Sequence, residues 1–152
     1  MSIEEETGCS GTAYQHETPP ELAVFLCRNS IPDAHVFPMQ WADAGIHIRV
    51  KLVPCSGKID IQYMLHALEA GKLGVCAITC PHGECTLAQG NYRAGVRVRT
   101  LRKLLEEIGL DTERAVIVNC PPGATAETVK SIVGSMAQTL ADSTAATACR
   151  RN

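Results

Sequence analysis

The chain has few aromatic residues, little net charge and no long hydrophobic run. Aromatic residues make up 4% of its 152 residues, and the formal net charge is −2. Nucleic-acid binding commonly relies on a basic surface and on aromatic side chains that stack against bases, so we expect no nucleic-acid partner. A membrane-spanning helix needs ~20 consecutive apolar residues. No run in the sequence approaches that length, so we expect no membrane span.

The first residues also lack the apolar segment of a secretory signal. They read MSIEEETGCSG and are acidic and polar. We therefore expect a reducing, cytoplasmic location, in which disulfides are rare. This expectation matters because the chain contains eight cysteines. In such a compartment, clustered cysteines more often bind metal or carry out redox chemistry.

Apolar segments of strand length alternate with segments of helical period. Strands are expected at 21–26, 46–53, 74–79 and 115–118, and helices at 60–70, 91–108 and 125–140. This alternation is typical of a parallel sheet covered by helices. It predicts a single α/β domain, a Rossmann- or flavodoxin-like three-layer sandwich with a parallel sheet of about four strands. The expected core stripe of the second helix is Val98, Leu101, Leu104, Leu105 and Ile108.

The remaining segments carry weaker patterns. We expect residues 1–20 to form an extended N-terminal arm, residues 21–140 the folded domain, and residues 141–152 a disordered tail of small residues. Residues 28–45 contain Pro32 and Pro38 and show no clear helical period, which predicts a loop with a short helix near Trp41-Ala42.

Four of the expected strands run directly into a cysteine. These cysteines are Cys27, Cys55, Cys80 and Cys120, and Cys85 follows Cys80 in the loop CPHGEC. Because the carboxyl ends of parallel strands meet at one edge of a sheet, we expect a row of thiols at that edge. Thiolates are soft ligands that suit zinc and iron–sulfur clusters. Cysteine is also a common small apolar residue of buried strands, the interpretation we favour for Cys76.

The spacing by itself leaves more than one kind of site open. Cys80 and Cys85 fit two metal ligands in one loop, but zinc would satisfy the same thiols, as in a zinc- or thiol-containing binding or regulatory module. A thiol-dependent enzyme with Cys80 or Cys85 as nucleophile would need a base, and the sequence places none beside them. His82 is a candidate extra donor, Cys120 a spare ligand, and Cys9 and Cys149 are expected to be free thiols.

Two stretches carry a family resemblance. VKLVPCSGKID, followed later by TCPHGECTLAQGNYRAGVRVRTLRKLLEEIGL, is similar to the iron–sulfur delta subunit of methyl-viologen-reducing hydrogenase, over about residues 22–135. The resemblance implies one [2Fe–2S] cluster bound by Cys27, Cys55, Cys80 and Cys85. It also implies a non-catalytic electron-transfer subunit that links an oxidoreductase module to a heterodisulfide-reductase-A-like flavoprotein in a larger complex.

The sequence departs from the family pattern at several places. Pro81-His82 inverts the usual His-Pro order, Thr86 stands where the family has His, and Lys58 where it has Arg. Ser30 stands where the first motif often has a second cysteine, so the implied ligands remain four.

Two further segments are expected to serve electron transfer. The arginines at the start of the 91–108 helix, Arg93 and Arg97, should lie near the cluster and raise its potential. The apolar residues of segment 28–45, together with the N-terminal arm, are expected to dock the flavoprotein; they are Val36, Phe37, Met39 and Trp41. The alternative is that this segment packs on its own sheet.

Overall fold

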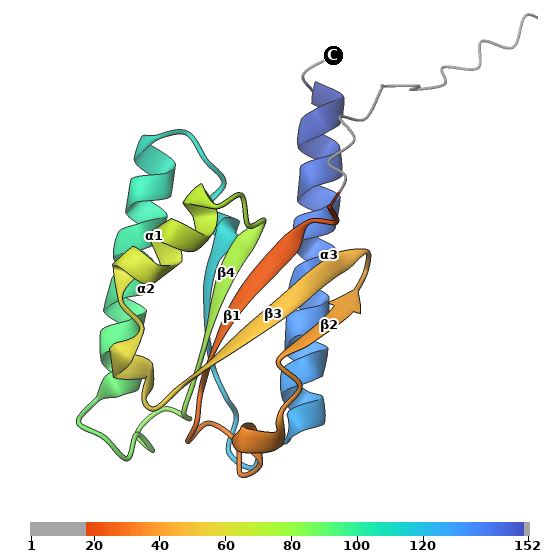
Figure 1. Ribbon diagram of the computed structural model, residues 1–152. Helices are drawn as coiled ribbons and strands as arrows, with labels where there is room; N and C mark the ends of the chain where they lie inside the picture. The colour runs from red at the N-terminus through yellow and green to blue at the C-terminus, as the bar shows by residue number, and fades with distance from the viewer. Residues whose placement is uncertain (1–17, 151–152) are drawn as a thin grey trace, which may run out of the picture.

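The computed structural model describes residues 18–150, which form a five-stranded sheet between helices (Figure 1). The strands are β1 (Glu21–Cys27), β2 (Gln40–Asp43), β3 (Ile46–Val53), β4 (Gly74–Thr79) and β5 (Ala115–Asn119), in the spatial order β2-β3-β1-β4-β5. β3, β1, β4 and β5 are parallel, and β2 pairs antiparallel with β3 at the edge.

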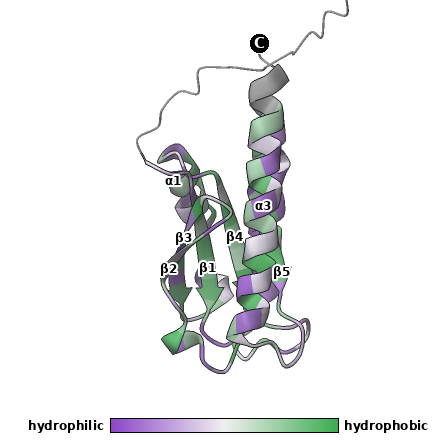
Figure 2. Ribbon diagram, turned by 90° about the vertical axis from the view of Figure 1, so that its right-hand side faces the viewer, coloured by the Kyte–Doolittle hydropathy of each residue, from purple (hydrophilic) through white to green (hydrophobic). Residues whose placement is uncertain are grey.

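The helices lie on opposite faces of this sheet. α1 (Ile61–Glu69) and α2 (Gly90–Glu107) cover one face, and α3 (Ala126–Arg150) covers the other (Figures 1 and 2). Short 3-10 turns connect the elements: η1 (Ala34–Val36), η2 (Ser56–Lys58) and η3 (Thr112–Arg114). The chain is therefore an α/β protein of three layers.

Alternating residues of the strands build two separate cores. Leu22, Val24 and Leu26 of β1 face α3, whereas Phe25 packs with the residues beneath α1 and α2. All six residues of β4 are buried. A central parallel strand covered on both faces requires such an unbroken apolar run, which explains why β4 was recognisable from the sequence.

The helix signals in the sequence correspond to real helix ends. The Asp60 carboxylate accepts a hydrogen bond from the backbone N–H of Gln62 at 3.0 Å and caps α1.

Within α2, Val98, Leu101 and Leu105 are buried as expected, but Leu104 is 38% and Ile108 69% exposed. The expected core stripe was thus too wide, because positions 98, 101 and 105 already define one face of the helix.

The sheet has five strands rather than the four expected. The additional strand, β2, lies in segment 28–45, which the sequence predicted to be a loop with a short helix. β2 and β3 are joined by Ala44 and Gly45, both in the left-handed region with φ of 50° and 75°. Two-residue hairpins favour this conformation, but alanine adopts it rarely, so the turn carried no clear sequence signal.

The C-terminal segment is also different from the expectation. Residues 141–150 were predicted to be disordered, but α3 continues through them to Arg150. Alanine recurs in this segment and has the highest helix propensity, which favours the extension. The expected arm at residues 1–20 lies outside the described residues up to position 17. Within the described part of the chain, no helix combines the length and hydrophobicity needed to cross a bilayer.

The order of the strands creates a crevice at one edge of the sheet. The chain leaves β1 in the direction of β3, and it leaves β4 in the direction of β5. The two connections therefore diverge from the carboxyl ends of neighbouring strands. In open α/β sheets this switch point is the usual place for a ligand.

Candidate metal centre

Two of the predicted cysteines lie at the switch point. Cys27 is the last residue of β1, and Cys80 follows β4 directly. Their Sγ atoms are 3.7 Å apart and both residues are 1% exposed. Two thiolates on one tetrahedral metal, with metal–sulfur bonds of ~2.3 Å, lie about 3.8 Å apart. The Cys27–Cys80 pair therefore already has the spacing of two ligands on one metal ion.

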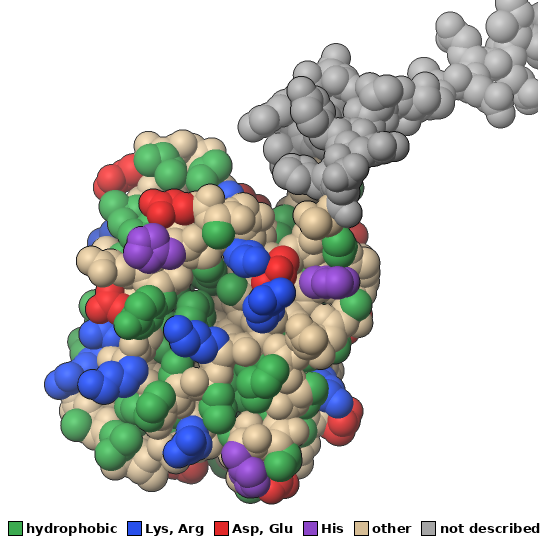
Figure 3. All heavy atoms as spheres, viewed as in Figure 1, with side chains coloured by type: hydrophobic (Ala, Val, Ile, Leu, Met, Phe, Trp, Pro, Cys, Tyr) green, Lys and Arg blue, Asp and Glu red, His purple; other side chains and the backbone are tan. Residues whose placement is uncertain are grey.

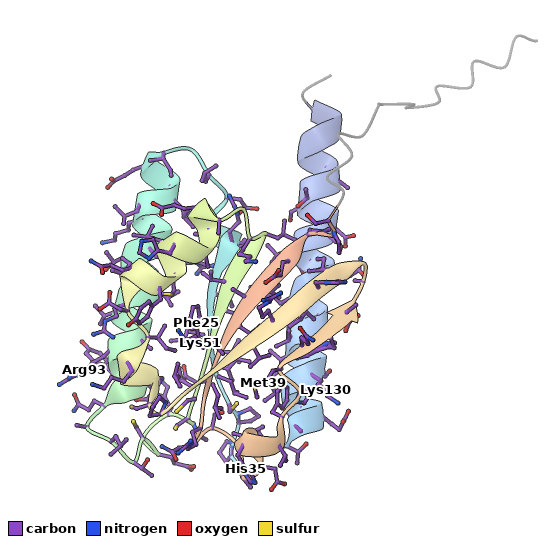
Figure 4. The ribbon with its side chains drawn as sticks, in the orientation of Figure 1. Phe25, His35, Met39, Lys51, Arg93 and Lys130 are labelled. Atoms are coloured by element: carbon purple, nitrogen blue, oxygen red, sulfur yellow. The ribbon has the colours of Figure 1, made fainter. Side chains whose placement is uncertain are left out.

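The other two predicted cysteines form a second pair. The carbonyl oxygen of Leu87 is 3.9 Å from the Cys55 Sγ and 3.3 Å from the Cys85 Sγ, and it accepts a hydrogen bond from each thiol. Cys85 is half-buried and Cys55 is 8% exposed. This outer pair is closer to solvent than the Cys27–Cys80 pair. Figure 4 shows sulfur atoms gathered at the lower edge of the sheet, where the loops after the strands meet.

Backbone N–H groups point at the sulfurs of the outer pair. Gly57 donates to the Cys55 Sγ at 3.4 Å, and Gly90 donates to the Cys85 Sγ at 3.2 Å. N–H donors stabilise negative charge on a sulfur atom. Burial raises the pKa of the Cys85 thiol, but hydrogen bonds from the backbone at Asn91, Leu87 and Gly90 outweigh it and lower that pKa overall. Cys85 is therefore prepared to become a thiolate, the form that binds metal.

The four thiols influence one another electrostatically. Burial raises the pKa of Cys80 to about 12, and negative charge on Cys27, Cys85 and Cys55 adds to the effect. Several thiolates this close together repel one another strongly without a cation between them. The positive charge of a bound metal would offset that repulsion and so favour the loss of the thiol protons that ligation requires.

Two glycines allow the loops to approach the outer pair. A Cβ atom on Gly90 would lie 2.4 Å from the Cys55 Sγ and 2.8 Å from the Gly57 nitrogen. A Cβ on Gly57 would lie 3.1 Å from the Gly90 Cα. The start of α2 and the Cys55 turn thus meet backbone to backbone, which only glycine permits. Sequence reasoning did not identify Gly90, although it belongs to the stretch that carries the family resemblance.

Two polar side chains hold the loops in place. The Arg97 Nη1 donates to the carbonyl oxygens of Gly57 at 2.7 Å and Ile59 at 2.8 Å, and so ties α2 to the turn after Cys55. The buried Asn91 amide donates to the Pro81 carbonyl oxygen at 3.1 Å and ties α2 to the loop after Cys80. Arg97 therefore positions a cysteine loop, whereas Arg93 is exposed at the rim of the site.

The remaining described thiols belong to neither pair, although Cys120 is close enough to Cys27 for negative charge on Cys27 to raise its pKa. Cys76 and Cys120 belong to the core beneath α3. Burial raises the pKa of Cys76 to about 12. Burial also raises the pKa of Cys120, although a hydrogen bond with Ser30 lowers it in part. The Ser30 hydroxyl also donates to the Cys27 carbonyl oxygen at 2.6 Å, so it closes the turn after β1. Cys9 and the Cys149 side chain lie outside the described residues.

The described residues do not offer a compact site for one metal ion. Within this part of the chain, no three His, Cys, Asp or Glu side chains converge on a single point. His82 is exposed, and no described histidine is hydrogen-bonded to any of the four thiols. The arrangement is therefore two pairs of thiols, with no neighbouring imidazole base for a nucleophilic cysteine.

The apolar residues of segment 28–45 divide between the interior and the surface. Phe37 is 3% exposed, and its ring packs edge-to-face on Trp41 with centroids 5.6 Å apart. Val36 and Met39 are 69% and 40% exposed. Phe37 and Trp41 thus pack on the protein's own sheet. Docking of a partner through the exposed Val36 and Met39 stays a prediction.

Known proteins resemble this chain across the site and most of the fold. A family model described as methyl-viologen-reducing hydrogenase, delta subunit, matches residues 22–142. An iron-sulfur subunit of the F420-non-reducing hydrogenase of Archaeoglobus profundus is 40% identical over 67 residues, which are 44% of this chain and 49% of that protein. The vhc iron-sulfur subunit of the F420-non-reducing hydrogenase of Methanococcus voltae is 33% identical over 101 residues, 64% of this chain and 68% of that protein.

One similar protein is much longer than this chain. It is a ferredoxin:CoB-CoM heterodisulfide reductase subunit of Methanosarcina mazei, 34% identical over 106 residues, which are 69% of this chain and 13% of that protein. For relatives such as the Archaeoglobus protein, the chain spans about half of the length, 49%.

Proposed function

The chain belongs to the delta-subunit family of methyl-viologen-reducing hydrogenase, and we propose that it is an electron-transfer subunit carrying one [2Fe–2S] cluster. Its ligands would be Cys27 and Cys80 on one side and Cys55 and Cys85 on the other. The relatives named iron-sulfur subunits support an iron–sulfur cofactor in general. The number of irons rests on the arrangement of the thiols.

That arrangement, two pairs of thiols, is the observation that carries the proposal. A [2Fe–2S] cluster takes two thiolates at each of its two irons. The Cys27–Cys80 distance of 3.7 Å suits one such pair, and Cys55 and Cys85 share the Leu87 carbonyl as the other. A single zinc ion would instead need four ligands around one point.

Each part of the chain has a defined task in this proposal. The buried Cys27–Cys80 pair and the surrounding core exclude water from one side of the site. Gly57 and Gly90 donate N–H groups to the outer sulfurs, and Arg97 keeps the Cys55 turn against α2. When bound, the cluster would accept and release one electron at a time. The protein itself would hold the two pairs of ligands and bring one of them close to the surface.

The partners follow from the similarity to longer proteins. Part of the M. mazei heterodisulfide reductase protein resembles this chain. When a domain is part of another protein's chain in one organism and separate in another, the two commonly work side by side. We therefore propose that this subunit relays electrons between an oxidoreductase module, such as a hydrogenase, and a heterodisulfide-reductase-A-like flavoprotein, in the cytoplasm.

The ligand assignment is tested by replacing one cysteine at a time. Cys55→Ala should abolish the brown colour and the iron and sulfide content of anaerobically purified protein. The matched control is Cys76→Ala, because Cys76 is equally a buried thiol but lies beneath α3. A colourless wild-type protein containing one zinc ion would contradict the cluster, and an intact EPR signal in Cys55→Ala would contradict the ligand set.

A further inference from the structure

An exposed surface of mixed apolar and basic character lies beside the outer cysteines. It consists of residues from η2, from the loop before α2 and from the first turns of α2: Lys58, Leu87, Tyr92, Arg93 and Val96, here called the outer rim. Leu87, Tyr92 and Val96 are 53%, 60% and 39% exposed. Lys58 and Arg93 are exposed as well. Tyr92 and Val96 are neighbours on successive turns of α2, and Leu87 lies three residues before that helix begins.

The outer rim opens onto the outer pair of thiols. A pocket of about 320 Å³ is lined by residues that include Lys58, Leu87, Arg93 and Cys55. Cys85 lies in the same loop as Leu87 and is half-buried. This is the side from which the proposed cluster is accessible, since Cys27 and Cys80 are both 1% exposed.

The backbone of the outer rim is strained where it passes the thiols. Ala88 and Gln89, directly after Leu87, have φ of 33° and 61°. Non-glycine residues rarely adopt this conformation, and residues that do so tend to occur at functional sites. The Leu87 side chain is exposed beside this strained turn, while its carbonyl oxygen contacts both outer thiols.

The charge of the outer rim is mainly positive. Figure 3 shows Lys and Arg side chains gathered over the lower half of α2, and Figure 4 shows Arg93 directed away from the sheet there. Glu84 is the acidic residue of the loop between Cys80 and Cys85, against Lys58 and Arg93 in the rim. Such a surface complements a partner surface that carries acidic residues, and complementary charge raises the rate at which two proteins associate.

We propose that the outer rim is the docking surface for a redox protein whose exposed cofactor is surrounded by acidic residues. The apolar side chains would form the dry centre of a small interface and the two cations would orient the partner. One electron would then pass between the partner's cofactor and the cluster, so that one is oxidised as the other is reduced. This inference rests on the proposed function and adds the side of the protein and the chemistry of the partner.

The test measures electron transfer from a reduced acidic plant-type [2Fe–2S] ferredoxin to the cluster-loaded protein by stopped-flow absorption. The variant Lys58→Glu/Arg93→Glu should slow the reaction at low salt at least tenfold, and the difference should shrink in ~1 M salt, where the Debye length is about 3 Å. Leu87→Ser/Tyr92→Ser should slow it at both salt concentrations, because the apolar contact is lost.

The matched control is Arg99→Glu/Lys103→Glu, which makes the same change in charge further along α2. Wild-type rates in this control would assign the effect to the outer rim. Equal slowing by both charge reversals would contradict the proposal and indicate a response to net charge. If ultracentrifugation shows a dimer that Leu87→Ser dissociates, the occupant is a second copy and the proposal is wrong. A protein without a visible chromophore would instead contradict the proposed function.

Discussion

Replacing Gly90 by alanine is the most direct test of how the two cysteine loops fit together. The new Cβ would lie 2.4 Å from the Cys55 Sγ and 2.8 Å from the Gly57 nitrogen. Carbon atoms in proteins rest about 3.5–4 Å from their neighbours, so the Cys55 turn would have to move by roughly 1 Å. Because one of the atoms belongs to the backbone, rotation of a side chain cannot relieve the overlap.

The expected loss can be estimated. Overpacking of this kind costs about 1–3 kcal/mol. Alanine gains about 0.8–1 kcal/mol over glycine in a helix interior, but Gly90 is the first residue of α2, so only a smaller part of the cost is offset there. Gly95, also in α2, provides the control, since its Cβ would meet only the Arg99 Nη1 at 3.5 Å and the Ile117 Cδ1 at 3.7 Å. Gly95→Ala should therefore be stabilising by about 0.5–1 kcal/mol.

Urea unfolding of the metal-free proteins and iron analysis of the loaded proteins provide the two readouts. We expect the two variants to differ by about 1–3 kcal/mol, which corresponds to about 1 M in the urea midpoint. Gly90→Ala should also bind less iron, because the displaced Cys55 turn carries one ligand. If Gly90→Ala is as stable as wild type and binds iron fully, the close approach of Gly57 and Gly90 does not position Cys55.

Three further predictions concern Arg97, Cys76 and Arg93. Arg97→Met should destabilise the protein by about 2–3 kcal/mol and speed cluster loss to a chelator, because two charged hydrogen bonds disappear. Arg99→Met is its control, and equal chelator rates would contradict the role of Arg97. Burial, and secondarily Cys120, raises the pKa of Cys76 from 9.0 to about 12. The folded metal-free protein keeps this proton while the unfolded chain loses it, so stability should fall from about pH 9 toward 12 by up to about 1.4 kcal/mol per pH unit. Cys76→Ala should flatten this slope in urea titrations at several pH values, and an unchanged slope would exclude Cys76 as a cause. Arg93→Glu should lower the midpoint potential in a redox titration, since it replaces a positive charge that favours the more anionic reduced state. A midpoint equal to that of wild type would reject this effect.

Local sequence signals predicted most elements of the fold but missed the edge hairpin. The strand at 46–53 and the strand at 74–79 have the expected bounds. Alternating β-branched residues mark the half-buried first strand, and an unbroken apolar run marks the fully buried second one. β2 depends on Ala44 in the left-handed region and on pairing with β3, for example Trp41 beside Ile48. Pairing between strands is a tertiary contact, so its main evidence is absent from the residues of the segment itself.

The sequence by itself determined the class of the fold, the family and the set of candidate cysteines. Hydrophobic period and helix caps are local properties, and the family motifs are contiguous stretches, so no tertiary contact is needed to recognise them. Only the tertiary structure decided how the thiols are grouped. The strand order brings Cys27 and Cys80 to the switch point, and the contact between Gly57 and Gly90 brings the turn of Cys55 to the loop of Cys85. These distances join residues far apart in the chain, and they arise from the packing of strands and loops rather than from the spacing of cysteines.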